Sequence, residues 1–315
     1  MNTSRTLFAV LLLCALNLGL AQGVQAAEDF KGNWTLMPSG QPGQVRFGLM
    51  HRMHGGRSHH ESDWPVSVLL GLDVKAPGKR DVRFSIARDA GRFDCQGYLD
   101  DGEGAGTFRF ALDARYVESM NSLGFTGIDE EKQFAMAVHD VTLDFARTMK
   151  SEKVSGLNTD MLIAFRIHDV TPQFIREIRA EGMTAIEAEK LIAYRIHGVS
   201  PAFVREVRKS GLKATEDQLV AMRIHGVTPE WIAQIRNNGY ELRDVEEMIA
   251  FRIHGVSPEF IAKVEKLGYK HPEPDQLVAM RIHGVTPEYI AGLRSRGMKN
   301  LTIDQMVNLR IHGIE

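Results

Sequence analysis

The histidines of this 315-residue chain are the first candidates for a chemical role, because of their number and spacing. An imidazole can bind a metal ion or transfer a proton near neutral pH. Four histidines gather in one short stretch, at His51, His54, His59 and His60. Seven others recur at a regular interval, at His139, His168, His197, His225, His254, His283 and His312. What either group can do depends on the elements that position it.

The recurring histidine belongs to a repeated phrase, Arg-Ile-His-Gly-Val-Thr-Pro-Glu, which is complete at residues 281–288. Successive histidines are separated by 29, 29, 28, 29, 29 and 29 residues. Such a period predicts repeats that stack into a solenoid. Neighbouring helices pack about 8–10 Å apart, whereas zinc holds each imidazole nitrogen at about 2 Å, so successive histidines cannot share one ion. We predict that this column is structural and satisfies carbonyl groups at helix ends.

Each repeat is predicted to be a helical hairpin, because both helices carry start and stop signals. The second helix begins with Thr-Pro or Ser-Pro, as at residues 228–229, and ends at a glycine such as Gly239. The first helix of the last repeat runs from near residue 302 to residue 312. Residues 113–124 reproduce the second helix without its proline. We therefore predict seven hairpins over residues 113–315.

Apolar positions of the repeat predict its core. One position of every second helix is aromatic, at Tyr116, Phe145, Phe174, Phe203, Trp231, Phe260 and Tyr289. The first helix is apolar almost all round, as at Leu277, Met280 and Ile282, which predicts burial on several sides. We expect the aromatic column to fill the space between repeats.

One arginine column lies two residues before the histidines. Its place between apolar columns predicts partial burial and pairing with carbonyls or with first-turn acids, and we favour this structural role over binding. The arginines are Arg166, Arg195, Arg223, Arg252, Arg281 and Arg310. The first-turn acids are Glu131, Asp160, Glu189, Asp217, Glu246, Asp275 and Asp304.

A second basic column ends the second helix of the repeats. It either complements the helix dipole or forms a positive ridge that binds a partner. These partner-binding candidates are Lys150, Arg179, Arg208, Arg236 and Arg294, and Glu265 interrupts them.

Residues 27–112 have a period of two instead. Val82, Phe84 and Ile86 alternate with polar residues, as do Phe108 and Phe110, and glycine-rich breaks separate the runs. This pattern predicts a small antiparallel β domain, sandwich-like or barrel-like. No linker separates it from the helices, so the first helical pair is predicted to pack on the sheet. The fold class is therefore α+β, with the β domain followed by an α-solenoid.

The histidine group in the β domain is a weak candidate metal site. His51 and His54 are predicted at the end of one strand, and His59 and His60 follow a glycine-rich turn. The imidazoles suffice in number for a metal, but nothing fixes them around one ion. We favour a histidine-rich hairpin loop and assign no metal or other cofactor.

Cys95 is the other reactive side chain of the β domain. It shares a strand face with Phe93, which predicts a buried thiol. It could act as a nucleophile only beside a histidine brought to it in space. A hydrolase is therefore the least favoured function.

The first 26 residues resemble a cleaved signal peptide, with Arg5, an apolar stretch at 7–20 and Val-Gln-Ala at 24–26. The stretch is shorter than the ~20 residues that span a bilayer, and the residue before Cys14 is too large for a lipidation site. We predict a periplasmic or secreted chain beginning at Ala27, without stable membrane insertion. The balance of 38 basic and 40 acidic residues gives no bias toward nucleic acid.

The repeated phrase resembles a tandem-repeat family of bacterial envelope proteins, in which it follows a Gly-x-Gly-x-Phe-x-Phe strand, here residues 104–110. Similar arrays are appended to membrane metallopeptidases of the β-lactamase-regulator antirepressor type. Their His-Glu-x-x-His motif does not occur in this sequence. The resemblance thus implies an extracytoplasmic accessory or sensory module without the protease.

We expect a non-enzymatic interaction or scaffold protein whose partner is another envelope protein. The alternative is a ligand- or metal-binding sensor that uses the β segment and its histidine-rich loop.

Overall fold

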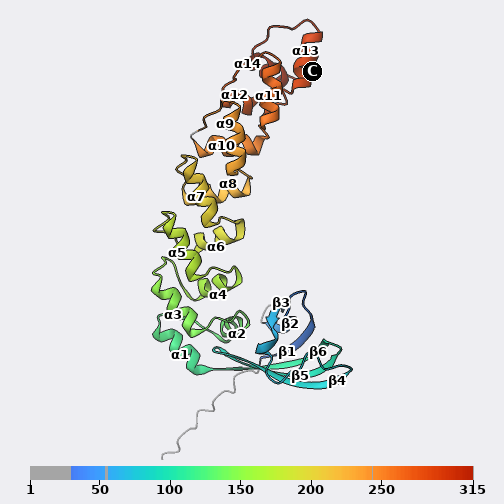
Figure 1. Ribbon diagram of the computed structural model, residues 1–315, viewed down its shortest axis with the longest axis vertical. Helices are drawn as coiled ribbons and strands as arrows, with labels where there is room; N and C mark the ends of the chain where they lie inside the picture. Colours follow the sequence, from blue (N-terminus) through green and yellow to red (C-terminus); the bar gives the residue numbers. More distant parts are fainter. Residues whose placement is uncertain (1–29, 54–55, 243, 315) are drawn as a thin grey trace, which may run out of the picture.

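The chain folds into a β-sheet at one end of a long column of helices, as Figure 1 shows. The computed structural model describes residues 30–53, 56–242 and 244–314. The predicted signal peptide and His54 lie outside these residues. The α+β fold class, with repeated helices after an antiparallel sheet, is confirmed. No helix in the described part of the chain is long and apolar enough to span a bilayer.

The sheet consists of two antiparallel three-stranded meanders, and the first strand of one pairs with the last strand of the other in the middle of the sheet. The strands are β1 (Phe30–Pro38), β2 (Gln44–Met53), β3 (Gly56–Pro65), β4 (Arg80–Arg88), β5 (Gly91–Asp100) and β6 (Glu103–Leu112). Their order is β3-β2-β1-β6-β5-β4, and β1 pairs antiparallel with β6. The alternation of apolar and polar residues could not distinguish a sandwich from a barrel, because it does not reveal which strands pair. The described residues form one sheet, with β3 and β4 at its edges.

Trp34 is the centre of the sheet's core and is fully buried. Its ring lies 6.1 Å from Phe47 and 5.2 Å from Phe84, and its Nε1 donates to the Gln96 carbonyl at 3.2 Å. A Cβ added at Gly106 would come within 2.7 Å of the indole. The glycine of this strand therefore makes room for the tryptophan.

Fourteen helices follow in the described residues. Even-numbered helices end at or just before the repeated histidine, and odd-numbered helices from α5 onward begin at the repeated proline. They are α1 (Ala114–Ser122), α2 (Glu130–Val138), α3 (Leu143–Ser151), α4 (Thr159–Ile167), α5 (Pro172–Ala180), α6 (Ala188–His197), α7 (Pro201–Lys209), α8 (Glu216–Ile224), α9 (Pro229–Asn237), α10 (Val245–His254), α11 (Pro258–Lys266), α12 (Pro274–Ile282), α13 (Pro287–Ser295) and α14 (Ile303–Ile311).

Local capping explains these boundaries. The Thr171 and Ser200 hydroxyls accept from the backbone N–H three residues later, as expected of N-caps before proline. Thr302 and Gln305 form a reciprocal capping box at α14. Each odd-numbered helix from α5 onward is followed by a glycine with positive φ, such as Gly182 at 90°.

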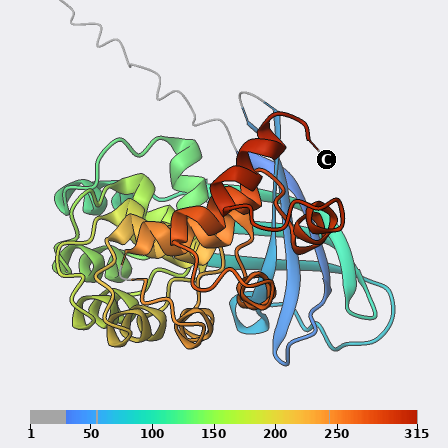
Figure 2. The same cartoon turned by 90° about the horizontal axis from the view of Figure 1, so that it is seen from above.

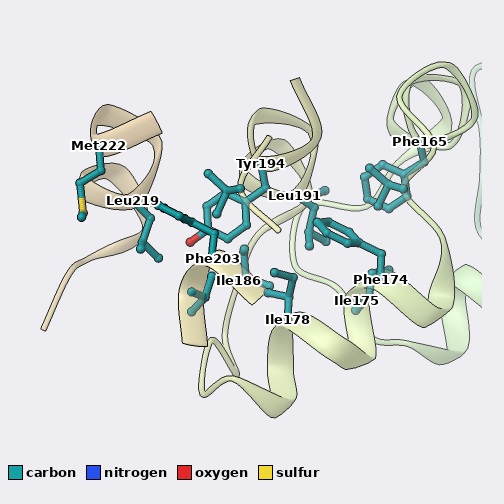
Figure 3. Close-up of a cluster of buried hydrophobic side chains, with 14 of the residues drawn as sticks. Phe165, Phe174, Ile175, Ile178, Ile186, Leu191, Tyr194, Phe203, Leu219 and Met222 are labelled. Carbon is teal, nitrogen blue, oxygen red and sulfur yellow. The ribbon is translucent and has the colours of Figure 1, made fainter. Parts of the chain in front are cut away.

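The helices stack in two parallel columns. From α4 to α14 each even-numbered helix contacts the next even-numbered one, and in the odd-numbered column α1 contacts α3, α5 contacts α7, α7 contacts α9 and α11 contacts α13. Figure 3 shows the core between the columns, where Phe174 and Phe203 of odd-numbered helices meet Leu191 and Tyr194 of α6. The aromatic column thus lies between repeats, as the sequence predicts.

The first helical pair packs on the sheet through α2, and Asp113 alone separates β6 from α1. Figure 2, viewed along the column, shows the sheet to one side of these helices. Phe134 of α2 is buried against the sheet, with its ring 5.4 Å from Phe30, 5.6 Å from Phe93 and 5.2 Å from Phe110. The Gln133 side chain donates to the Ala90 carbonyl at 2.7 Å. Aromatic packing and a buried hydrogen bond thus join sheet and solenoid.

Candidate interaction surface

The repeated histidine takes part in the stack mainly through its backbone. The His168 N–H donates to the Ala164 carbonyl at 2.9 Å and closes α4. The His168 carbonyl then accepts from Arg195 Nε of the next repeat at 3.1 Å. The same contact joins five further pairs of repeats, at 3.0–3.4 Å. The imidazole is half-buried or exposed in all seven repeats.

The arginine column binds each repeat to the one before it. Besides the bond to the histidine carbonyl, each guanidinium lies over the aromatic ring of the preceding repeat, 4.8–5.4 Å from its centroid. The predicted partial burial holds for Arg195 and Arg310, whereas the other four arginines are exposed. An exposed cation–π contact together with a charged hydrogen bond stabilises such an interface by about 1–2 kcal/mol. This geometry gives the column a clear structural task.

The acids predicted to pair with these arginines pair elsewhere. Arg166 bonds Asp140 at 3.0 Å, and Arg195 bonds Asp169, both in the turn after an even-numbered helix. The first-turn Asp160 instead meets Lys132 of the preceding repeat at 2.8 Å. Of the two predicted kinds of partner, the structure shows the carbonyls and not the first-turn acids, because the arginine side chain extends toward the corner of the previous repeat, away from the first turn of its own helix.

The basic column at the ends of the odd-numbered helices also reaches back by one repeat. Lys150 donates to the Leu123 carbonyl at 2.6 Å, and Arg179 meets Glu152 at 3.3 Å. Arg208, Arg236 and Arg294 likewise donate to carbonyls at the end of the preceding odd-numbered helix. These contacts favour dipole complementation, and binding of a partner through this column stays a prediction.

A surface that the sequence analysis missed lies between the arginine and histidine columns. The isoleucine there is more than half exposed in six repeats, at Ile167 (51%), Ile196 (55%), Ile224 (56%), Ile253 (54%), Ile282 (53%) and Ile311 (54%). We call these six residues the isoleucine stripe. The predicted burial of the first helix on several sides is therefore wrong for this position. Helical spacing could have predicted this exposure. Ile167 follows the buried Phe165 by two residues, which is about 200° around the helix and so on nearly the opposite face.

The first repeat shows how protein can cover the same face. Val138 occupies the stripe position in α2 but is only 7% exposed. Phe134, one turn earlier on that face, is 1% exposed beneath the sheet. The corresponding residues of α4 and α12, Ile163 and Val278, are half-buried. The stripe thus continues the surface that the sheet covers in the first repeat.

The structure separates the candidate metal ligands of the β domain. His59 and His60 lie within β3, where a loop was predicted, and pair with Met50 and Leu49 of β2. Because neighbours on a strand face opposite ways, His60 turns inward, whereas His59 is 54% exposed beside Glu61. Among the described residues, no group of three His, Cys, Asp or Glu is suited to hold a metal ion.

The inward histidines meet His139 at the junction of sheet and helices. His51 is 4% exposed, and its Nδ1 has no hydrogen-bond partner. Burial lowers the pKa of His51 and His60, and their neighbouring imidazoles lower it further. Burial, with His60 and Arg166, lowers the pKa of His139 to about 4. All three rings are therefore neutral near pH 7.

Cys95 lies in the core of the sheet at 4% exposure. Burial, and secondarily the Asp94 carboxylate, raises the pKa of its thiol well above the usual range. The thiolate needed for nucleophilic attack is thus disfavoured.

The outer face of the sheet carries an open hollow of about 1070 Å³. Polar side chains of several strands line it, among them Arg83, Gln96 and Thr107. A second open hollow of about 720 Å³ is lined by His59 and Glu61, so it is this hollow that adjoins the histidine-rich segment of the ligand-binding alternative.

Comparison of the chain with protein-family models, curated proteins and solved structures finds no match.

Proposed function

We propose that this protein is a non-enzymatic scaffold of the bacterial envelope that binds another envelope protein along the isoleucine stripe. The supporting observation is the repeated exposure of one large aliphatic side chain, above half in six successive repeats. Single exposed apolar residues are common on protein surfaces, but a continuous row of them is typical of a binding surface. An elongated solenoid offers such a surface to an extended partner.

The energetics suit a contact distributed over several repeats. Burying the exposed half of one isoleucine side chain stabilises a complex by about 1 kcal/mol. Association itself costs several kcal/mol in lost freedom of motion, so one or two such contacts are insufficient. Binding therefore requires several consecutive isoleucines at once.

The occupant that fits is an extended segment of the partner protein. The stripe is one side chain wide, and stacked helices advance by about 8–10 Å per repeat. An extended chain in the polyproline II conformation advances by about 3.1 Å per residue with three residues per turn, so aliphatic side chains at every third residue lie on one face and match the period. In the first repeat, this chain's own sheet already covers Phe134, and Val138 on the same face is buried as well.

The test places a photo-crosslinking amino acid at Ile224 in cells that express the full chain. The matched control carries it at Gln234, an exposed position on the odd-numbered helix α9. We expect a crosslink to an extended partner segment from position 224 only. Crosslinking from position 234 but not 224 would contradict the proposal.

The affinity of the captured segment then tests the stripe directly. The triple variant Ile196, Ile224, Ile253→Gln should bind at least about tenfold more weakly at an unchanged melting temperature. The variant Arg179, Arg208, Arg236→Gln tests the basic column in the same assay. Loss of binding only in this second variant, at an unchanged melting temperature, would move the binding surface to the basic column.

A further inference from the structure

Three histidines that are distant in sequence meet between the sheet and the first helices. The rings of His51 on β2 and His60 on β3 are nearly parallel, with centroids 6.0 Å apart. His139, which follows α2, approaches His60 edge-on at 5.6 Å. The ring of Phe134 lies 4.2 Å from His51. The imidazoles thus form part of the interface.

The two strand histidines face few charges that could compensate a proton. Glu131 of α2 favours the charged form of His51, but burial and His60 outweigh it. The adjacent His59, on the opposite face of β3, also opposes protonation of His60, whose Nε2 lies 2.9 Å from the Ser58 hydroxyl. A second proton in this group would therefore meet repulsion in a partly buried site.

His139 faces cationic groups from the helical side. Arg166 of α4 opposes its protonation, as does His60 across the interface. The nearest turn carries Asp140, but two guanidinium groups already neutralise this carboxylate, Arg88 of β4 and Arg166, each at 3.0 Å. Burial, His60 and Arg166 thus all favour the neutral form of the His139 ring.

We propose that His51, His60 and His139 form an acid-sensitive latch, which holds the sheet against α2 while the imidazoles are neutral and releases it when they are protonated. Release separates the sheet from Phe134 and Gln133 and leaves the more distant repeats stacked. The latch does not depend on any partner of the isoleucine stripe.

The direction of the pH dependence follows from proton linkage. A histidine whose pKa is depressed in the docked state binds protons better after release. Its contribution to docking is complete above the ordinary value of 6.5 and is lost as the pH falls toward about 4, the pKa of docked His139. His51 and His60, also shifted downward, act in the same direction. Between pH 7 and pH 5, the equilibrium constant for release should rise by about tenfold or more.

Hydrogen–deuterium exchange of the full chain tests this proposal. Protection factors, corrected for the intrinsic pH dependence of exchange, are measured at pH 7 and pH 5 for α2 and β3. Helix α12 in the same molecule serves as the reference. We expect protection at α2 and β3 to fall by about tenfold or more on acidification, while protection of α12 holds. An equal loss at α12, or no loss at α2, would overturn the latch.

The variant His139→Gln identifies the group responsible. It places an uncharged polar side chain at the end of α2, so the fall in protection between pH 7 and pH 5 should shrink. The matched control His283→Gln changes the same repeat position far from the sheet and should keep the full response. If His139→Gln fails to fold, NMR titration of the wild-type histidines decides: the latch requires one ring that titrates below pH 5.

Discussion

The first and the later repeats place the same phrase in different surroundings. In α2 the stripe position is a buried valine, and the following histidine is held neutral by its surroundings. In α12 the stripe position is an isoleucine at 53% exposure, followed by an exposed histidine. Both helices nevertheless end at the histidine, whose N–H donates to the carbonyl of an alanine four residues earlier. The backbone contacts of the repeated phrase therefore hold the repeats together. The burial of its outward side chains depends on what packs against the stripe face, which in the first repeat is the sheet.

The turn after the histidine marks the same difference. Asp140 and Asp169 adopt positive φ of 54° there, where later repeats have glycines such as Gly226 at 69°. Asp140 bonds Arg88 of β4 and Arg166 of α4 at once. The repeats nearest the sheet thus accept a less favourable backbone conformation in exchange for ion pairs, one of which reaches the sheet.

The largest effect is expected from truncating the aromatic contact of the first repeat. Phe134→Ala should lower the free energy of unfolding by about 3–5 kcal/mol, because it leaves a cavity between α2 and the sheet. Val278→Ala, at the corresponding half-buried position of α12, should cost about 1 kcal/mol. Urea denaturation followed by circular dichroism measures both. Equal costs would show that the sheet adds nothing to burial in the first repeat.

A polar residue at the stripe position should destabilise the first repeat more than a later repeat. Val138→Gln buries an amide without a partner and should cost about 1–3 kcal/mol. Ile253→Gln changes an exposed side chain and should stay within about 0.5 kcal/mol of the wild type. Thermal melts of the two variants beside wild type are the measurement. A large cost at position 253 would mean that the stripe is structural.

A smaller effect is expected at the arginine that joins repeats. Arg252→Ala removes the contact with Trp231 and the bond to the His225 carbonyl and should cost about 1–2 kcal/mol. Arg205→Ala removes a 52% exposed side chain paired with Glu181 and should cost less than about 1 kcal/mol. Denaturant midpoints of both variants test the difference. A reversed order would assign the arginine column to binding.

Local signals made most of the secondary structure predictable. The Thr-Pro pairs, the capping boxes and the glycines act within a few residues, so the helix ends follow from sequence. The alternation around Phe84 and Phe108 likewise predicts strands.

Contacts between distant segments could not be predicted. The meeting of His60 with His139, and the burial of Val138 but not of Ile167, depend on where the sheet packs. Strand alternation does not fix that position. The aspartate partners of Arg166 and Arg195 were missed for a similar reason, since they belong to the preceding repeat.

Because the isoleucine stripe repeats regularly, successive binding positions along it are nearly equivalent. A segment that spans three of the six isoleucines could bind in about four registers, which alone adds up to about 0.8 kcal/mol of configurational entropy to binding. The shorter interval of 28 residues between His197 and His225 is one irregularity in the series, and the sheet blocks one end. A partner could therefore slide along the column in steps of one repeat without leaving it.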